Sequence, residues 1–522
     1  MDRIGVYGWG IVAPNCPDIE AFSQKLKQAT SWLSPFHGFG PNNFLVGLPD
    51  FRFACYKNWI EQRFHPSRYR QLVEKMDITS LYAIAAFIQA LKQNPGIEQE
   101  LQSLGTMAHV YIGTGLGNLP TISQATVSLY LAQRTWNKFW SDPCRNEKLR
   151  NHLASKNTEN PNIPPHPETV DLQEHEQAEN VWLSYWTDNS IELQHYLEEL
   201  AEIESMSIEG NVEKEKLHVI REKQHRKTKL QAKWESPPPP WEEVSANLIW
   251  NVSNTPASQV SMLGKITGLA FAPVAACATF GVTLKLAIDT IRRKEAKLVV
   301  IGATDPPPQP VTVAAFYKAR VLSADGKISK PLSGLRGTHV SGGSVVWIVG
   351  DFDYMAQKGY RPLGLEPLSV GVNADAEHII TPSKEGPKTA IHQAFELAKI
   401  HPEEIALWDV HATATPGDYL EIETLKQIVT SKVLVTSRKG TFGHGMSAGG
   451  GWELTAQYLG YQEGMVFPTP LKKKDLNAEI AHIHENFVFD SACQTPHGIV
   501  GKLSMGVGGI NACVLSRPWH SS

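Results

Sequence analysis

The chain has 522 residues, of which 42% are hydrophobic and 20% charged, and its formal net charge is -4 at pH 7. This composition is typical of a globular protein, and the length predicts roughly two to four domains with room for large cores. The small negative charge gives no indication of binding to nucleic acid or to an anionic membrane.

Six cysteines are scattered along the chain, and no two of them form a Cys-x-x-Cys pair. Scattered cysteines favour reduced thiols and argue against a zinc cluster or a disulfide framework. The N-terminus reads as a short strand, and no apolar stretch reaches the roughly 20 residues that span a bilayer. We therefore expect a cytoplasmic protein without a transmembrane segment or a bound metal.

The first predicted elements are a glycine-punctuated strand over 3–12 and a helix at about 19–28. A run that is apolar on nearly all sides predicts a buried helix over 78–93. A strand over 109–113 then leads into the glycine-rich loop Thr114-Gly-Leu-Gly-Asn. That loop has neither a GxGxxG pattern with a ribose-binding acid nor a Walker lysine, so it does not predict a nucleotide site.

Residues at about 142–243 differ in kind from the rest of the chain, because they are strongly charged and rich in proline. An acidic amphipathic helix is predicted at 191–206 and a lysine-rich helix at 212–234. Acidic and basic residues are interspersed there, and stacking aromatics are few. The segment is therefore predicted to be an inserted helical hairpin with solvated faces, in preference to a nucleic-acid site.

From Leu248 onward, strands and helices alternate. Strands are predicted at 269–275, 298–302, 345–350, 362–371, 405–411, 432–437, 486–490 and 512–515, and helices at 278–294, 387–399, 417–428 and 448–462. With the N-terminal elements they form two halves of the same element order, 1–351 and 352–522. The predicted fold class is α/β, with two duplicated βαβαβαββ halves in an α/β/α/β/α layered arrangement.

Cys277 stands between an apolar strand and a predicted helix, with alanines on both sides of it. Unpaired backbone N–H groups and the helix dipole at such a position favour a thiolate and can bind an oxyanion. The competing interpretation is an ordinary buried cysteine, which is the commoner role of a single Cys. Partners elsewhere in the chain must decide between them.

Two histidines follow predicted strands of the second half. His411 ends the strand 405–411, and His444 lies in a glycine-dense turn at the place that matches Cys277 in the first half. A third turn, Gly506-Val-Gly-Gly-Ile-Asn511, could bring backbone amides close to a ligand. Either histidine alone could be structural. Together with Cys277, at strand ends of both halves, they predict a site between the halves.

These segments resemble the β-ketoacyl–acyl carrier protein synthases of the KAS I/II type, which are condensing enzymes of the thiolase-fold superfamily. Val274-Ala-Ala-Cys277-Ala-Thr is similar to the family's nucleophile elbow, and His411-Ala-Thr-Ala-Thr-Pro-Gly-Asp-Tyr-Leu-Glu421 is similar to its first histidine motif. Lys439-Gly-Thr-Phe-Gly-His444 resembles Lys-x-x-x-Gly-His, and Met505-Gly-Val-Gly-Gly-Ile-Asn511 resembles Phe-Gly-Phe-Gly-Gly-Thr-Asn. The motifs occur in the family's order, and the resemblance covers nearly the whole chain outside about 142–243.

The resemblance implies a role for each matching residue. Cys277 would accept the acyl group, and His411 and His444 would bind the malonyl thioester carbonyl and promote its decarboxylation. Lys439 would order the site through an ion pair with Glu421. The backbone N–H groups of Cys277 and Val507 would form the oxyanion hole. No cofactor is implied.

Some positions depart from the family pattern. The two gating phenylalanines are replaced by Met505 and Val507, and we add Leu116 of the first-half glycine-rich loop as a candidate for the acyl pocket. Smaller or more flexible side chains at the gate predict looser control or a bulkier acyl chain. The insertion near 142–243 is also unusual and suggests a specialised lipid or polyketide pathway.

The implied partner is an acidic acyl carrier protein, loaded with acyl or malonyl groups, and the implied assembly is a homodimer. Basic residues are therefore candidates for carrier docking, although each could equally be solvated surface charge. The candidates are Arg68, Arg70, Lys75, Arg134 and Lys138.

Two alternatives stay open at the level of sequence. One is a carrier-protein-dependent acyltransferase or thiolase relative, which the two histidines disfavour because thiolases use a second cysteine as base. The other is a non-catalytic partner subunit of a condensing heterodimer, which the presence of Cys277 disfavours.

Overall fold

The computed structural model describes residues 2–40, 43–155, 161–208, 210, 212–377, 379, 383–430 and 432–519. The chain divides into two compact units. The first comprises Met1–Pro120 and Ile249–Ser522, and the second comprises Thr121–Leu248. Both five-stranded sheets and all of the predicted site motifs lie in the first unit.

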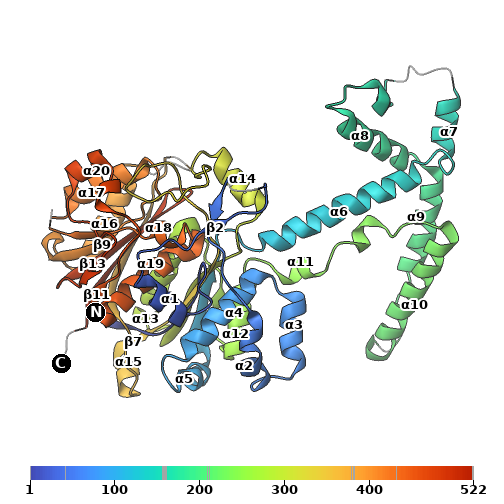
Figure 1. Cartoon of the computed structure of the whole chain (residues 1–522). Coiled ribbons are helices and arrows are strands. Elements are labelled where there is room, and N and C mark those ends of the chain that lie inside the picture. The colour runs from blue at the N-terminus through green and yellow to red at the C-terminus, as the bar shows by residue number, and fades with distance from the viewer. Residues whose placement is uncertain are drawn as a thin grey trace. The chain divides into compact units, whose positions relative to one another are not determined.

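Figure 1 shows the chain coloured from its N-terminus to its C-terminus. The first sheet is built from the first half of the chain, in the order β1-β7-β6-β4-β5. Its strands are β1 (Ile4–Val12), β4 (Ala108–Gly113), β5 (Ala270–Phe271), β6 (Leu298–Asp305) and β7 (Gly343–Asp351). β4 runs parallel to β5 and β6, whereas β7 is antiparallel to β1 and β6. Every residue of β1, β4, β6 and β7 is buried, as expected for strands covered on both faces.

The second sheet repeats this topology in the order β10-β9-β13-β14-β8. Its strands are β8 (Leu365–Ala374), β9 (Ile405–Asp409), β10 (Leu434–Thr436), β13 (Ile499–Gly506) and β14 (Ile510–Pro518). If the five strands of each half are numbered in chain order, both sheets have the strand order 1-5-4-2-3 from one edge to the other. The fifth strand is antiparallel to both of its neighbours in each sheet. The predicted duplication is confirmed.

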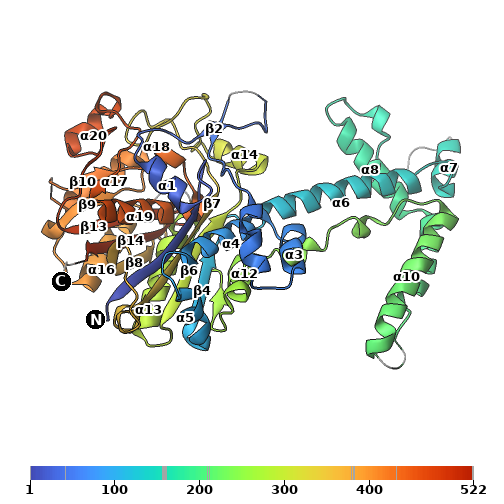
Figure 2. The ribbon, with the colours of Figure 1, turned by 60° about the horizontal axis from the view of Figure 1, so that its bottom comes forward.

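Helices complete a five-layer α/β/α/β/α arrangement (Figure 2). The outer layer on the first sheet contains α4 (Ile78–Leu91) and α12 (Thr255–Gly264), and the outer layer on the second contains α16 (Glu385–Ala398) and α17 (Gly417–Ile428). Two helices, α13 (Thr279–Arg292) and α19 (Met446–Glu463), pack against each other between the sheets. Each central helix begins just after a predicted site residue, Cys277 or His444. The predicted fold class is confirmed.

Glycine allows the two central helices to approach closely. A Cβ atom on Gly451 of α19 would lie 2.7 Å from the Phe280 ring of α13 and 2.4 Å from a methyl group of Val345 on β7. Such contacts leave no room for a side chain. The glycine-rich start of α19 therefore fixes the spacing of the central layer.

Two predicted strands of the first unit differ from the structure. The stretch predicted at 486–490 makes an isolated bridge between Phe487 and Val435, and the closing hairpin is formed by β13 and β14 instead. β13 contains Lys502, and a lysine in a central strand obscured the apolar pattern on which the prediction rested. The strand predicted at 269–275 has regular pairing only over β5, because the chain then turns into the elbow at Cys277.

The second unit is helical. Its main helices are α6 (Leu119–Trp140), α7 (Glu147–Ala154), α8 (His175–Asp188), α9 (Ile191–Glu204) and α10 (Val212–Trp234). The predicted hairpin corresponds to α9 and α10, which pack against each other. Trp136 and Trp140 of α6 join their core with Tyr196 and Leu230. The unit is thus wider than the charged segment 142–243, because α6 supplies part of its core.

The remaining elements are short and mostly peripheral. They are α1 (Ile19–Leu26), α2 (Lys57–Glu61), α3 (Ser67–Lys75), α5 (Ile97–Ser103), α11 (Asn247–Trp250), α14 (Pro310–Lys318), α15 (Phe352–Gln357), α18 (Lys439–Phe442), α20 (Ala478–Ile483), β2 (Ser34–Pro35), β3 (Leu45–Val46), β11 (Met465–Val466) and β12 (Cys493–Gln494). Of these, α18 contributes directly to the site.

Candidate active site

Cys277 lies in a tight elbow between the end of the β5 segment and α13. A 3-10 turn over Ala276–Ala278 carries it, and Ala276 has a φ of 46°, in the left-handed region that is costly for a residue with a Cβ atom. The Thr279 hydroxyl stabilises the elbow by donating to the Ala276 carbonyl (2.7 Å) and accepting from the Ala275 N–H (3.0 Å). The strained turn places the sulfur at the start of a central helix.

Burial dominates the protonation of Cys277 and raises its pKa to about 11. The charge of Lys439 opposes this rise, as do the backbone N–H groups of Val507 and of Cys277 itself. These are the two N–H groups predicted for the oxyanion hole, and both act on the sulfur in this structure. They converge because Gly506, the last residue of β13, passes close to the elbow: a Cβ atom there would lie 3.3 Å from the Cys277 nitrogen.

His411 and His444 line the same cavity as Cys277. Their ring centroids are 5.5 Å apart, and the rings are nearly perpendicular, at 84°. The Met446 N–H donates to His444 Nδ1 (3.0 Å), and the Lys439 ammonium lies 3.5 Å from His411 Nδ1. Because a cation or an N–H group faces each Nδ1, the proton of each neutral ring belongs on Nε2.

Both imidazoles are neutral at physiological pH. Burial lowers the pKa of His411 well below its ordinary value, and the Lys439 cation lowers it further. Burial also lowers the pKa of His444 to about 3, again with the help of Lys439. Two neutral rings with Nε2–H groups beside a cysteine can donate two hydrogen bonds to one oxygen atom of a ligand.

The predicted Lys439–Glu421 ion pair is wrong. Lys439 Nζ binds Glu453 Oε1 at 2.7 Å and donates to the His411 carbonyl, and both side chains of the ion pair are almost fully buried. Glu421 instead accepts the backbone N–H groups of His411 (2.6 Å) and Ala412 (2.8 Å). Burial raises the pKa of Glu421 to about 7. Glu453 takes the lysine because it lies on α19, next to α18, whereas Glu421 lies on α17.

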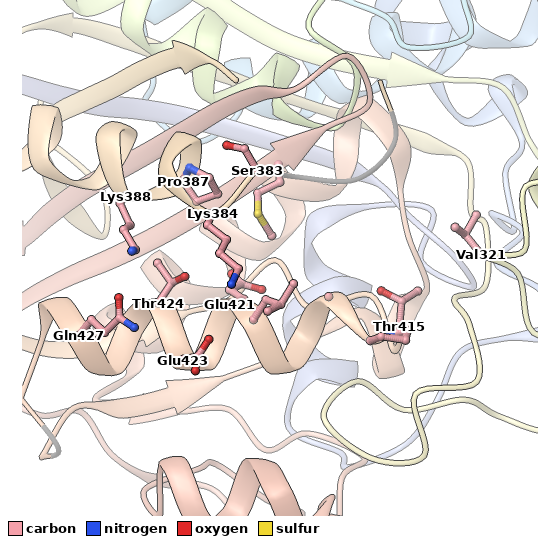
Figure 3. A pocket seen from close by; sticks show the side chains of 14 residues that line it. Val321, Ser383, Lys384, Pro387, Lys388, Thr415, Glu421, Glu423, Thr424 and Gln427 are labelled. Atoms are coloured by element: carbon pink, nitrogen blue, oxygen red, sulfur yellow. The ribbon is translucent and has the colours of Figure 1, made fainter. Parts of the chain in front are cut away.

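The cavity that contains Cys277 has a volume of about 140 Å³, and a larger cavity of about 570 Å³ lies beside it. Met505 lines both cavities, together with Val321 and Thr415, whereas Val507 lines the smaller one. Figure 3 shows the larger cavity between α16 and α17, with Lys388 extending from α16 and Lys384 from the residue just before that helix. Met505 thus lies at the junction of the two spaces.

Leu116 does not line either cavity. Its side chain packs with the apolar cluster of Phe36, Val313 and Met446, and its backbone N–H donates to Asp305 (2.6 Å). Phe316, which does line the Cys277 cavity, packs against the same cluster. Leu116 therefore contributes to the apolar surroundings of Phe316 and does not itself line the cavity.

The candidate docking residues fall into two groups. Arg68, Arg70 and Lys75 lie on α3, where Arg68 binds Gln259 (2.9 Å) and Lys75 lies over the Trp250 ring. Arg134 and Lys138 belong to the second compact unit, and both form ion pairs with Glu179. The structure therefore does not bring the five together as one surface of a single unit.

Three buried charged residues of the site region were not found from the sequence. Glu453 and Lys502 form an ion pair below the histidines, and Asp305 accepts hydrogen bonds from the backbone of Gly115 and from the Ser447 hydroxyl. Glu453 lies on α19, the helix that begins just after His444, so its position on the face toward α18 was a usable signal. Lys502 and Asp305 carried none, because single charges in apolar strands have no pattern.

Within the residues that the structure describes, no group of three or more His, Cys, Asp or Glu side chains is placed to hold a metal ion. Among the same residues, no helix is long and apolar enough to cross a membrane.

The duplicated halves, the central helix pair and the cysteine elbow at its start define a thiolase-like fold, and comparisons with known proteins agree. Residues 222–349 match the family model described as the N-terminal domain of β-ketoacyl synthases, and residues 367–471 match that of their C-terminal domain. These two stretches of the chain therefore match the β-ketoacyl synthase family of condensing enzymes.

Individual relatives are distant. One is the chloroplastic 3-oxoacyl-[acyl-carrier-protein] synthase I of Arabidopsis thaliana, 30% identical over 204 residues, which are 37% of this chain and 43% of that protein. The chain thus spans less than half the length of that relative.

Two solved structures share the fold. The ishigamide ketosynthase/chain length factor has a TM-score of 0.69 at 17% identity, covering 99% of this chain and 100% of that one. A type II PKS ketosynthase solved with its acyl-carrier protein and a hexaketide has a TM-score of 0.65 at 16% identity, again covering 99% and 100%.

Proposed function

We propose that the protein is a decarboxylating condensing enzyme of fatty-acid or specialised lipid and polyketide synthesis. It takes an acyl group from an acyl carrier protein onto Cys277 and joins that group to malonyl-acyl carrier protein. The observation that carries the proposal is one cavity lined by Cys277 and by two neutral histidines whose Nδ1 atoms are both engaged. No cofactor is needed for this chemistry.

In the first half-reaction, the Cys277 sulfur attacks the thioester carbonyl of the acyl carrier. The thiol loses its proton as the carbon–sulfur bond forms, and the departing carrier thiol gains one. The N–H groups of Cys277 and Val507 stabilise the tetrahedral oxyanion, at roughly 3 kcal/mol for each donor. The same two donors oppose the burial that raises the pKa of the thiol, so they also favour the thiolate.

In the second half-reaction, the malonyl thioester replaces the first carrier. Its carbonyl oxygen accepts the Nε2–H groups of His411 and His444. The carbon–carbon bond to the carboxylate breaks and carbon dioxide leaves. The electron pair of that bond stays on the remaining carbon and forms an enolate, whose oxygen the two donors stabilise. The enolate carbon then attacks the acyl-Cys277 carbonyl, and the Cys277 thiolate leaves as the β-ketoacyl carrier forms.

Neutral histidines suit this role better than charged ones. A protonated His411 would place an N–H group against the Lys439 ammonium, and a protonated His444 would place one against the Met446 N–H. Lys439 therefore acts as a positioning residue that keeps His411 neutral and oriented, and Glu453 holds Lys439.

Met505 and Val507 are the proposed gate. Met505 lies between the Cys277 cavity and the larger one, so rotation of its flexible side chain would join the two spaces. The combined space supports selection of a bulky acyl group. Leu116 is retained only as an indirect wall of this pocket, because it packs against the same apolar cluster as Phe316.

The partners are also proposals. An acyl carrier protein is supported by the family and by the ketosynthase of similar fold that was solved with its own carrier. Of the candidate docking residues, those on α3 are favoured, because Arg134 and Lys138 already share Glu179. A homodimer is supported by β5, an edge strand whose flanking residues Leu269 and Val274 are more than half exposed.

We also propose that the two halves meet near residue 351, since β7 closes the first sheet there and α15 follows. The helical unit then interrupts the first half. A cytoplasmic location fits the six cysteines, none of which forms a disulfide.

A direct experiment is incubation with acyl- and malonyl-carrier protein, followed by mass spectrometry of the peptide that contains Cys277 and of the carrier products. We expect an acyl adduct on Cys277 and a β-ketoacyl carrier. An adduct without condensation would indicate the acyltransferase alternative. Condensation in the absence of any adduct on Cys277 would contradict the proposal, and absence of both products would indicate a non-catalytic partner subunit.

A further inference from the structure

Five buried charged side chains form a continuous chain beneath the two histidines. Glu453 binds Lys439 through Oε1 (2.7 Å) and Lys502 through Oε2 (2.9 Å). Lys502 in turn lies 3.4 Å from Asp409, which lies 3.6 Å from Arg438. Signs alternate along the chain, and each side chain is at most 3% exposed.

Such a cluster forms only where each charge has an opposite charge beside it, because an isolated buried ion is expensive. Lys502 occupies its centre. It lies on β13, between β9 and β14 of the second sheet, and it is the common partner of Glu453 and Asp409. The Lys502 ammonium also donates to the Leu503 carbonyl (2.6 Å), which fixes the end of its side chain.

We propose that Lys502 is a positioning residue for the decarboxylation step, acting through Glu453 and Lys439 on His411. The proposal rests on the proposed function of the site. The geometric reason is that the Glu453 carboxylate is held at both of its oxygens, one by each lysine. Without Lys502, Oε2 would lose its cation and the carboxylate could rotate. Lys439 would then lose its fixed contacts with the carbonyl and Nδ1 of His411.

Lys502 also contributes to the charge around His411. Its positive charge lowers the pKa of His411, after burial, Lys439 and His444. The titratable groups that surround His411 come from several elements. Removal of Lys502 would leave the negative charge of the carboxylates among them with less positive charge to oppose it. These groups are Cys277 before α13, Asp409 on β9, Asp418 and Glu421 on α17, Lys439 on α18, His444 and Glu453 at α19, and Lys502 on β13.

The test compares Lys502→Met with Lys297→Met. Lys297 forms an ion pair with the buried Asp351 (2.8 Å) on the first sheet and lies outside the site, so it controls for loss of a lysine ion pair. Two rates are measured against pH: acylation of Cys277, and release of carbon dioxide from malonyl-carrier protein. Thermal unfolding shows whether each variant is folded.

For Lys502→Met, we expect release of carbon dioxide to fall about 10- to 100-fold, as is typical when a group that orients a functional residue is lost. The acidic limb of its pH profile should move to higher pH, because His411 becomes easier to protonate. Acylation of Cys277 should change much less. Lys297→Met should change neither the profile nor the ratio of the two rates.

A folded Lys502→Met protein with an unchanged rate and pH profile for carbon dioxide release would overturn the inference. If that variant does not fold, the double variant Asp409→Asn with Lys502→Met removes one charge of each sign and is judged by the same criteria. A wild-type protein that releases no carbon dioxide would instead overturn the proposed function, so the two failures are distinguishable.

Discussion

Replacing Glu453 by Gln tests which carboxylate, Glu453 or Glu421, is the ion-pair partner of Lys439. In the structure, Glu453 contacts Lys439 at 2.7 Å and Lys502 at 2.9 Å, with all three side chains nearly excluded from solvent. The glutamine keeps the shape but removes the negative charge, so two buried ammonium groups lose their shared anion. Breaking a buried ion pair on one side typically costs about 3 to 5 kcal/mol.

The matched control is Glu421→Gln. Glu421 accepts only backbone N–H groups, from His411 and Ala412, and a glutamine oxygen can still accept one of them. Any loss should therefore be at most about 1 to 2 kcal/mol, the effect of one or two weakened hydrogen bonds, and it should be offset because a neutral glutamine avoids burying the charge that Glu421 carries above its raised pKa. Urea unfolding at neutral pH measures both free energies. Equal losses, or a larger loss for Glu421→Gln, would refute the assignment of Glu453 as the partner of Lys439.

Three further predictions follow from the site. Burial raises the pKa of Glu421 to about 7, above the ordinary value of 4.5, so its protonated form favours the folded state. Its contribution is complete below pH 4.5 and is lost as pH rises through 7, by about 3 kcal/mol at 1.36 kcal/mol per unit. Glu421→Gln should remove that part of the pH dependence of unfolding, whereas an unchanged dependence would contradict the raised pKa. The rate of carbon dioxide release by the wild type should show no inflection near pH 6.5, because the pKa of His444 lies at about 3 and that of His411 is also lowered. An inflection near pH 6.5 that is absent from a His411→Ala or His444→Ala variant would mean that a histidine titrates normally. Met505→Phe should close the junction between the 140 Å³ and 570 Å³ cavities and shift acylation of Cys277 toward shorter or slimmer acyl groups. Competition between carriers loaded with acyl chains of different length measures the shift. An unchanged preference would exclude Met505 as the gate.

Much of the fold could be predicted because its signals are local. The apolar run of α4, the strand-to-helix pattern around Cys277 and the repeated element order all reflect burial or periodicity in the sequence. The closing strand β13 was missed for a physical reason. Lys502 interrupts its apolar pattern, and only Glu453 and Asp409, which are distant in sequence, make a lysine stable there.

The site shows the same division. Cys277, His411 and His444 could be predicted as neighbours, because each follows a strand in a duplicated fold. The partner of Lys439 could not, since Glu421 and Glu453 are both carboxylates near the motif and only the helix packing distinguishes them. Leu116 was placed in the pocket from its glycine-rich loop, but its side chain turns into the neighbouring apolar cluster.

The most direct test of the central claim is release of carbon dioxide from malonyl-carrier protein by a variant that carries both His411→Ala and His444→Ala. The wild type should release carbon dioxide, and the double variant should lose this activity by about 100-fold or more, since it lacks both donors to the enolate oxygen. The variant should still form an acyl adduct on Cys277. Carbon dioxide release that survives the loss of both histidines would contradict the account.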